Sequence, residues 1–201
     1  MSVAGIDPEI ATLVIPLVAA ALLAVLPGYR TTARLNIVAS LATLVAATSL
    51  FFVDRPPPGA YLLVDDLNIV FLVLTAFVAF TTSIFSASYI GHEIEAGHLS
   101  PAYLRFYHAM YQLLMFGMNL ALLANNIGIM WVAIELATLT TVLMVGIYRT
   151  HEALEAAWKY FILGSVGIAL ALFGTILVYM ASGPVIGEGG DSMVCISASL
   201  K

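Results

Sequence analysis

Long apolar stretches separated by short polar segments dominate the chain. Six of these stretches are about twenty residues long and carry few charged side chains. An α-helix rises 1.5 Å per residue, so about twenty residues cross a hydrocarbon core about 30 Å thick. The pattern therefore predicts six transmembrane helices, at about residues 11–28, 35–53, 67–90, 106–124, 127–148 and 156–181.

Helix-breaking residues lie between the predicted helices. Three prolines at 56–58 follow the second helix, and Asn125 with Asn126 leaves only a very short turn between the fourth and the fifth. Helices joined by so short a turn lie antiparallel and side by side. We expect an all-α, polytopic membrane helix bundle over residues 1–181 and a polar, flexible tail at 182–201, which has no apolar run long enough to cross a membrane.

Composition narrows the class of protein. Of the 201 residues, 62% are apolar and 9% charged, against about 45–50% and about 25% in soluble domains. Seven basic residues and a net charge of −5 leave no basic patch for nucleic acid. Cys195 is the only cysteine, which excludes an internal disulfide and a cysteine-based metal site. We find no nucleotide, flavin or cluster motif, so we expect no cofactor, no metal and no catalytic centre in this chain.

The distribution of basic residues predicts the orientation. Short loops rich in Lys and Arg face the cytoplasm. Arg55 is alone among acidic residues on one side, whereas Lys159 and four arginines belong to the other. These are Arg30, Arg34, Arg105 and Arg149. We therefore expect a multi-pass protein of the cell inner (plasma) membrane with both termini on the outer side. The first apolar stretch has no basic residue before it and is too long for a secretory signal, so we interpret it as a retained helix.

Glu135 is the one acidic side chain deep inside a predicted helix. It lies about nine residues into the fifth helix, which places it near the bilayer midplane. An ionised group there costs about 2.5–3.5 kcal/mol, so we expect it to face protein or trapped water. We interpret Glu135 as a proton-transfer residue. The alternative is a protonated carboxyl that only ties helices together, with Thr138 as a candidate partner.

Lys159 and His108 are the other candidates for proton transfer. Lys159 lies near the start of the sixth helix, where an antiparallel neighbour could bring it into one layer with Glu135, at a distance that the sequence does not fix. The alternative is an ion pair with Glu155, four residues earlier, with the side chain reaching to the interface. His108 lies near the start of the fourth helix, and a histidine titrates near neutral pH, which suits the mouth of a proton path. Its alternative is an ordinary interfacial side chain.

The fifth and sixth helices also carry a resemblance to a known family. Asn125-Asn126-Ile127-Gly128, the stretch from Trp131 to Glu135, and Ala-Ala-Trp-Lys-Tyr-Phe-Ile-Leu-Gly at 156–164 resemble the antiporter-like membrane subunits. Proton-pumping NADH dehydrogenase, group 4 membrane hydrogenases and multi-subunit sodium/proton antiporters share these subunits. The likeness is greatest to hydrogenase-4 component F, and it runs from about residue 60 to 181.

The resemblance implies a fold and a set of roles. The chain would correspond to the N-terminal part of a fourteen-helix subunit with two inverted repeats, each containing a broken helix. Glu135 occupies the place of the glutamate that is central to proton transfer, and Lys159 belongs to the same polar axis. The family's lysine on the seventh helix, its broken eighth helix with a histidine, and its second repeat are missing from these 201 residues. The implied partners are other membrane subunits of a redox complex and, indirectly, soluble hydrogenase- or dehydrogenase-type subunits.

These observations lead to one expected function and two alternatives. We expect a proton-translocating membrane subunit, truncated relative to its family, of a redox-driven complex such as a membrane-bound hydrogenase or an NADH:quinone oxidoreductase-like enzyme. The alternatives are a subunit of a secondary sodium/proton antiporter and a non-catalytic membrane scaffold or remnant. One deep carboxylate and one shallow lysine do not make a path across about 30 Å of hydrocarbon, so we expect no ion flux from the 201 residues alone.

Overall fold

Six α-helices make up almost all of the described chain. The computed structural model describes residues 7–53, 55–57, 59–97 and 101–186. The helices are α1 (Pro8–Val25), α2 (Tyr29–Ser49), α3 (Asp66–Glu95), α4 (Pro101–Leu123), α5 (Ile127–Val145) and α6 (His151–Ile186), with short 3-10 helices η1 (Leu50–Phe52) and η2 (Gly146–Tyr148). An isolated antiparallel bridge joins Leu62 and Ala124. The predicted all-α helix bundle is confirmed.

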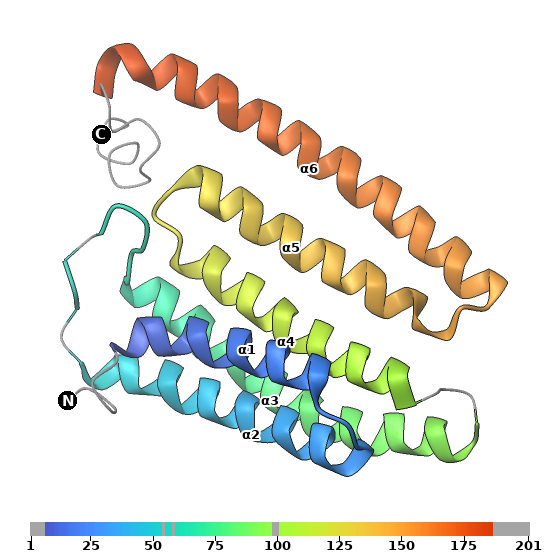
Figure 1. Cartoon of the computed structure of the whole chain (residues 1–201). Coiled ribbons are helices and arrows are strands. Elements are labelled where there is room, and N and C mark those ends of the chain that lie inside the picture. The colour runs from blue at the N-terminus through green and yellow to red at the C-terminus, as the bar shows by residue number, and fades with distance from the viewer. Residues whose placement is uncertain (1–6, 54, 58, 98–100, 187–201) are drawn as a thin grey trace.

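The helices run back and forth with similar axis directions (Figure 1). α4 lies between α1 and α5, α2 and α3 pack beside α1 and α4, and α6 flanks α5 at the edge. The connections α1–α2, α3–α4 and α5–α6 meet at one end, which we call the arginine end because it carries the following residues: Arg30, Arg34, Arg105 and Arg149. The opposite end, with Arg55, Asp65 and Asp66, is called the aspartate end.

Five of the helices are long and apolar enough to cross a membrane. Among the described residues, this holds for α1, α2, α3, α5 and α6. The exception is α4, which was also predicted to span and which carries His108, Gln112 and Asn119 among its apolar residues. All three side chains are buried in the bundle. These three polar side chains therefore face protein rather than lipid.

Most of the helices begin or end beyond their predicted limits, and the differences at α4 and α6 bear on the candidate site. The apolar pattern placed the start of the fourth helix at about 106, but α4 begins at Pro101, a residue suited to the first turn of a helix. α6 continues to Ile186, past the predicted end at 181. The remainder of the predicted tail, 187–201, lies outside the described residues. With 36 residues, α6 is about 54 Å long, well beyond the hydrocarbon thickness of about 30 Å.

The aspartate end is held by hydrogen bonds around Asn125. Its backbone N–H donates to Tyr61 O (2.8 Å), and its Nδ2 donates to Gly59 O (2.6 Å). Leu63 N–H donates to Leu123 O (2.8 Å) in the same contact. The segment between α2 and α3 is thereby fixed to the turn between α4 and α5.

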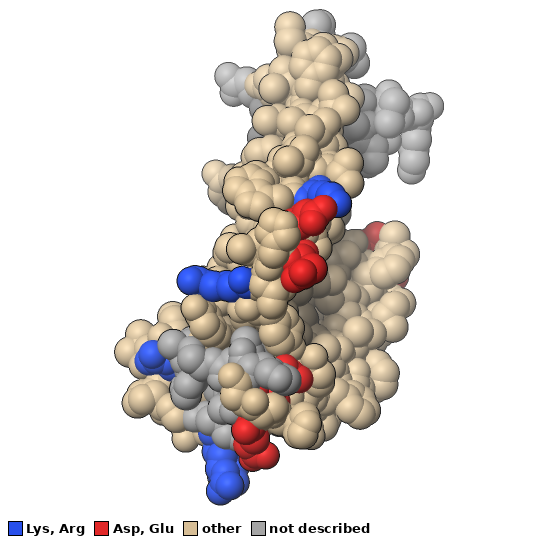
Figure 2. All heavy atoms as spheres, turned by 90° about the vertical axis from the view of Figure 1, so that its right-hand side faces the viewer, with Lys and Arg blue, Asp and Glu red and all other residues tan. Residues whose placement is uncertain are grey.

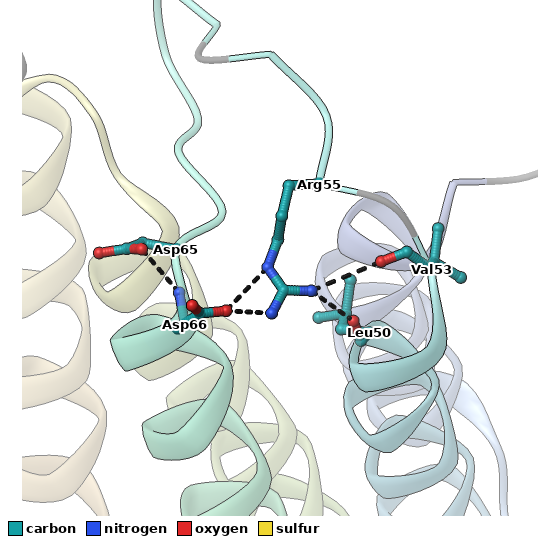
Figure 3. A network of polar contacts seen from close by, with 5 residues as sticks. All are labelled: Leu50, Val53, Arg55, Asp65 and Asp66. Carbon is teal, nitrogen blue, oxygen red and sulfur yellow. Dashed lines mark hydrogen bonds and ion pairs between the residues drawn. The ribbon is translucent and has the colours of Figure 1, made fainter.

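Arg55 also makes contacts between helices at the aspartate end (Figure 3). Arg55 forms an ion pair with Asp66 at the start of α3, and its Nη1 reaches the carbonyl oxygens of Leu50 (3.4 Å) in η1 and Val53 (3.5 Å) just after η1. Asp65 accepts a hydrogen bond from the backbone N–H of Asp66 (2.7 Å). The one arginine of the aspartate end therefore joins the ends of α2 and α3.

Candidate functional site

Glu135 lies midway along α5. It is the ninth of the 19 residues of this helix, counted from Ile127. The side chain is half-buried, and Oε2 is inaccessible and has no hydrogen-bond partner in the part of the chain that the structure describes. A polar atom buried without a partner is costly, so such atoms are rare outside functional sites and hydrated sites.

Close contact between α4 and α5 shields one side of this level. A Cβ added to Gly117 of α4 would lie 3.1 Å from Ala133 O and 3.2 Å from Ala137 N. Ala133 and Ala137 precede and follow Glu135 by two residues on α5. The absence of a side chain at Gly117 therefore lets the two backbones touch at the depth of Glu135, leaving no room there for lipid or bulk water.

Thr138 does not tie Glu135 to a neighbouring helix. Its Oγ1 donates to Ile134 O (3.0 Å), four residues earlier on the same helix. Its methyl group contacts α6, where a Cβ added to Gly164 would lie 3.1 Å from Thr138 Cγ2. The helix-tying alternative that the sequence allowed is therefore not made through Thr138 in this structure.

Lys159 lies at a different depth from Glu135. Trp131 Nε1 donates to Ile168 O (2.9 Å), and the hydroxyl groups of Thr141 and Tyr160 lie 3.2 Å apart, which fixes the register between α5 and α6. In this register Lys159 lies level with residues near 142. It is therefore displaced from Glu135 by about seven residues, or about 10 Å along the helix.

The Lys159 side chain pairs with Glu155. Nζ contacts Glu155 Oε1 one turn earlier on α6, and the two side chains are 71% and 53% exposed. No hydrogen bond or ion pair joins Lys159 to Glu135 in the described ranges. The two residues lie on neighbouring helices as expected, but the expected common layer is not formed in this structure.

His108 is buried, which corrects the expectation of a residue near the membrane surface. Because α4 begins at Pro101, His108 lies about two turns inside the helix instead of near its start. The neighbouring Ala109 packs with Ala19 and Leu23 of α1. His108 is 0% exposed, and neither ring nitrogen has a hydrogen-bond partner among the described residues.

A buried polar cluster between α1, α2 and α4 contains His108. We call it the polar seam and define it by these residues: Thr12, Asn36, Ser40, His108, Gln112 and Asn119, all almost completely buried. Gln112 Nε2 donates to Asn36 Oδ1 (2.8 Å) and Ser40 Oγ (3.1 Å). Asn119 Nδ2 donates to Thr12 O (3.0 Å). These contacts connect three helices inside the bundle.

Sequence reasoning identified only His108 of this seam. The other members are neutral, so they do not stand out among charged residues. Their signal was the spacing, since Asn36 and Ser40 are one turn apart and Gln112 and Asn119 two turns apart inside apolar stretches. Such spacing places polar side chains on one face of a helix.

The other charged side chains lie toward the two ends of the bundle, among them the four arginines of the arginine end. Figure 2 views the molecule from this end and shows Lys, Arg, Asp and Glu side chains over its lower part, below a long column without charges. The column belongs to α6, whose apolar window is not buried by the rest of the described chain. No group of three or more His, Cys, Asp or Glu side chains suited to a metal ion occurs among the described residues.

Known proteins are similar in sequence to the part of the chain that contains Glu135. Residues 124–188 match the family described as NADH:quinone oxidoreductase/Mrp antiporter, TM. The hydrogenase-4 component F homolog of Methylacidiphilum infernorum is 60% identical over 183 residues, which cover 91% of this chain and 38% of that protein. The resemblance to the antiporter-like membrane subunits is confirmed. The chain spans less than two-fifths of the length of that relative.

Other antiporter-like subunits extend the comparison. NADH-quinone oxidoreductase subunit N 1 of Aquifex aeolicus is 27% identical over 160 residues, which cover 76% of this chain and 32% of that protein. The fold matches a chain of the membrane-bound sulfane sulfur reductase, an archaeal respiratory membrane complex. That match has a TM-score of 0.72 at 21% identity and covers 89% of this chain and 38% of the other. The matched structure is a membrane complex, and this chain is a membrane protein of the same fold.

Proposed function

We propose that this chain supplies part of the proton-translocating membrane subunit of a redox-driven complex, with Glu135 as the group that takes up and releases the proton. The observation that carries the proposal is the position of Glu135 Oε2, a buried atom without a partner halfway along a membrane helix. The similarity to a hydrogenase-4 component and to NADH-quinone oxidoreductase subunits supports it. A membrane-bound hydrogenase or an NADH:quinone oxidoreductase-like enzyme is therefore the proposed setting.

Electrostatics gives such a carboxyl group the free energy that pumping requires. A cation that approaches the carboxylate stabilises its ionised form, and when the cation leaves, the apolar surroundings favour the protonated form. Two unit charges about 4 Å apart interact by about 4 kcal/mol at an effective dielectric constant of about 20. Moving one charge against 100 mV takes about 2.3 kcal/mol. The approach and departure of one cation is therefore enough to drive one proton.

Electron transfer belongs to other subunits in this proposal. The chain contributes the membrane part, and soluble hydrogenase- or dehydrogenase-type subunits contribute the redox centres. Changes at those centres would reach Glu135 through movements of charged groups in neighbouring membrane subunits. Co-purification of such soluble subunits with the chain supports this setting over a free-standing transporter.

A second candidate function is a subunit of a secondary sodium/proton antiporter. The matching family description names the Mrp antiporter beside NADH:quinone oxidoreductase. A sodium gradient applied to vesicles without any redox substrate separates the two functions. Proton movement in response to sodium alone favours the antiporter, and proton movement that requires redox turnover favours the pump.

We propose supporting roles for Lys159 and His108 in proton transfer. Replacing Lys159 with alanine is expected to lower proton uptake more than replacing Glu155 with glutamine. The first change removes a cation from the helix next to the one that carries Glu135, whereas the second only releases that cation from its exposed partner. Proton uptake by vesicles that contain the assembled complex measures both. Equally small effects of the two variants would show that the Lys159–Glu155 pair is only a surface ion pair.

The orientation is proposed from the arginine end. Basic loops face the cytoplasm, so α1 begins and α6 ends on the outer side of the inner membrane. In a Cys195→Ser background, an impermeant maleimide added to spheroplasts should label Pro57→Cys, near the aspartate end, and leave Thr150→Cys unlabelled until the membrane is opened. Both positions are exposed and lie at opposite ends of the bundle. The reverse labelling pattern would invert the orientation.

A further inference from the structure

Several polar atoms of the polar seam have no hydrogen-bond partner among the described residues. They are Asn36 Nδ2, Gln112 Oε1, Asn119 Oδ1 and both ring nitrogens of His108. Each belongs to a side chain that is at most 1% exposed. Buried polar groups in proteins are almost always hydrogen-bonded to protein or to ordered water. Internal water molecules typically bind where several such groups converge.

The seam is built from matching polar positions on two parallel helices. α2 and α4 both run from the arginine end to the aspartate end (Figure 1), and the contact between Gln112 and Asn36 sets an offset of 76 residues. The same offset places Thr32 level with His108 and Thr43 level with Asn119. Both threonines are also almost completely buried. Polar side chains therefore face each other at successive levels along the two helices.

The seam covers a large part of the membrane depth. His108 and Asn119 are separated by eleven residues of α4, or about 16 Å, which is about half of a hydrocarbon core about 30 Å thick. Ser40 contributes a hydroxyl group beside Gln112. Thr43 donates its own hydroxyl to Ala39 O (2.9 Å) and keeps an oxygen that accepts hydrogen bonds.

The seam lies on the opposite side of α4 from Glu135. Gly117, where α4 touches α5, follows Gln112 by five residues and precedes Asn119 by two. At about 100° per residue these intervals turn the helix by about 140° and about 160°. The α4 backbone therefore separates the seam from the α4–α5 contact beside Glu135.

We propose that the polar seam binds a chain of ordered water molecules and forms a proton-conducting segment separate from the Glu135 site. Amide and hydroxyl side chains hold the waters, and His108 donates and accepts protons at the end nearer the arginine end. Each transfer moves a proton from one hydrogen-bonded oxygen or nitrogen to the next, and the donor regains a proton from the group behind it. The conducting role rests on the proposed function as a proton-translocating subunit, whereas the bound water does not.

Radical footprinting of the assembled complex tests the bound water directly. Met115 lies about one turn from both Gln112 and Asn119 on α4, is 4% exposed and packs beside the seam with Ala79 of α3 and Tyr111. Hydroxyl radicals made from water by a brief X-ray pulse oxidise a methionine that has water beside it. We expect Met115 to be oxidised in the wild-type complex in spite of its burial. An unmodified Met115 in that complex would overturn the proposal without any variant.

Variants locate the water at the seam. Gln112→Leu removes the amide that contacts Asn36 and Ser40, and it should lower Met115 oxidation several-fold. Ser40→Ala is a milder change in the same contact, and it should lower oxidation in the same direction if Gln112→Leu fails to assemble. Ser83→Ala is the matched control, because Ser83 of α3 is 0% exposed and its hydroxyl donates to Phe80 O (2.7 Å) of its own helix. Equal oxidation in all three variants would contradict a seam-bound water chain.

Proton uptake by the same vesicles tests conduction. In the assembled complex, Gln112→Leu or Ser40→Ala should lower proton uptake per redox turnover several-fold, and Ser83→Ala should leave it unchanged. Lowered Met115 oxidation with unchanged uptake would overturn the conducting role. Normal pumping by Glu135→Gln would contradict the proposed role of Glu135. The oxidation of Met115 would still show whether water is bound in the polar seam.

Discussion

Replacing Glu135 with glutamine is expected to reduce proton uptake to the background level while the complex still assembles. Glutamine keeps the size of the side chain and one acceptor oxygen but cannot ionise. The change therefore removes the proposed proton carrier without opening a cavity at the contact between α4 and α5. Proton uptake by inverted vesicles during redox turnover measures transport, and the yield of intact complex after mild solubilisation measures assembly.

Glu155→Gln is the matched control for this prediction. It makes the same chemical change at a carboxylate that is exposed near the arginine end. Uptake should remain close to the wild-type value in this variant. An equal loss in both variants would mean that net charge, and not the buried carboxyl group, controls uptake.

A valine at Gly117 is expected to destabilise the bundle and to impair transport. Even the first added carbon would lie 3.1 to 3.2 Å from backbone atoms of α5, which have no side-chain freedom to move away. Overpacking of this kind costs about 1–3 kcal/mol. The helices must separate at the depth of Glu135, which admits water and weakens the control of its proton. Thermal unfolding of the solubilised protein and proton uptake by vesicles measure the two effects.

Gly167→Ala provides the comparison for the change at Gly117. Gly167 also lies in the interior of a membrane helix, but an added Cβ there has no neighbour within 4 Å in the described structure. Alanine is favoured over glycine in a helix by about 1 kcal/mol. This variant should therefore be as stable as the wild type or more stable. A Gly117→Val protein with wild-type stability would show that α4 and α5 are not held in close contact.

Hydrophobicity was sufficient to predict six helices, five of which are long and apolar enough to cross a membrane in the described part of the chain. Long uncharged stretches have few alternatives to a membrane helix, because lipid requires backbone groups to be paired within the segment. The same reasoning placed Glu135 correctly at the middle of α5, since depth follows from position within a helix. The short turn at Asn125 and Asn126 was also foreseeable, and Asn126 accepts a hydrogen bond from Ile129 N–H at the start of α5 (3.2 Å).

Helix boundaries and the register between helices could not be obtained in this way. α4 starts in a polar segment that hydropathy does not assign to a helix, so His108 was expected near the surface and lies in the core. Register depends on specific contacts, such as that between Trp131 and Ile168, which determine the level at which Lys159 faces α5. The neutral members of the polar seam, such as Gln112, became recognisable only when their partners on α2 were known.

Proton uptake per redox turnover in the Glu135→Gln complex tests the central claim most directly. Vesicles with wild-type and variant complex are compared at equal rates of substrate oxidation, so that a loss of redox activity cannot imitate a loss of pumping. The proposal predicts that the variant oxidises its substrate while proton uptake per turnover falls to the background level. A fully assembled variant with the wild-type number of protons per turnover would contradict the role of Glu135.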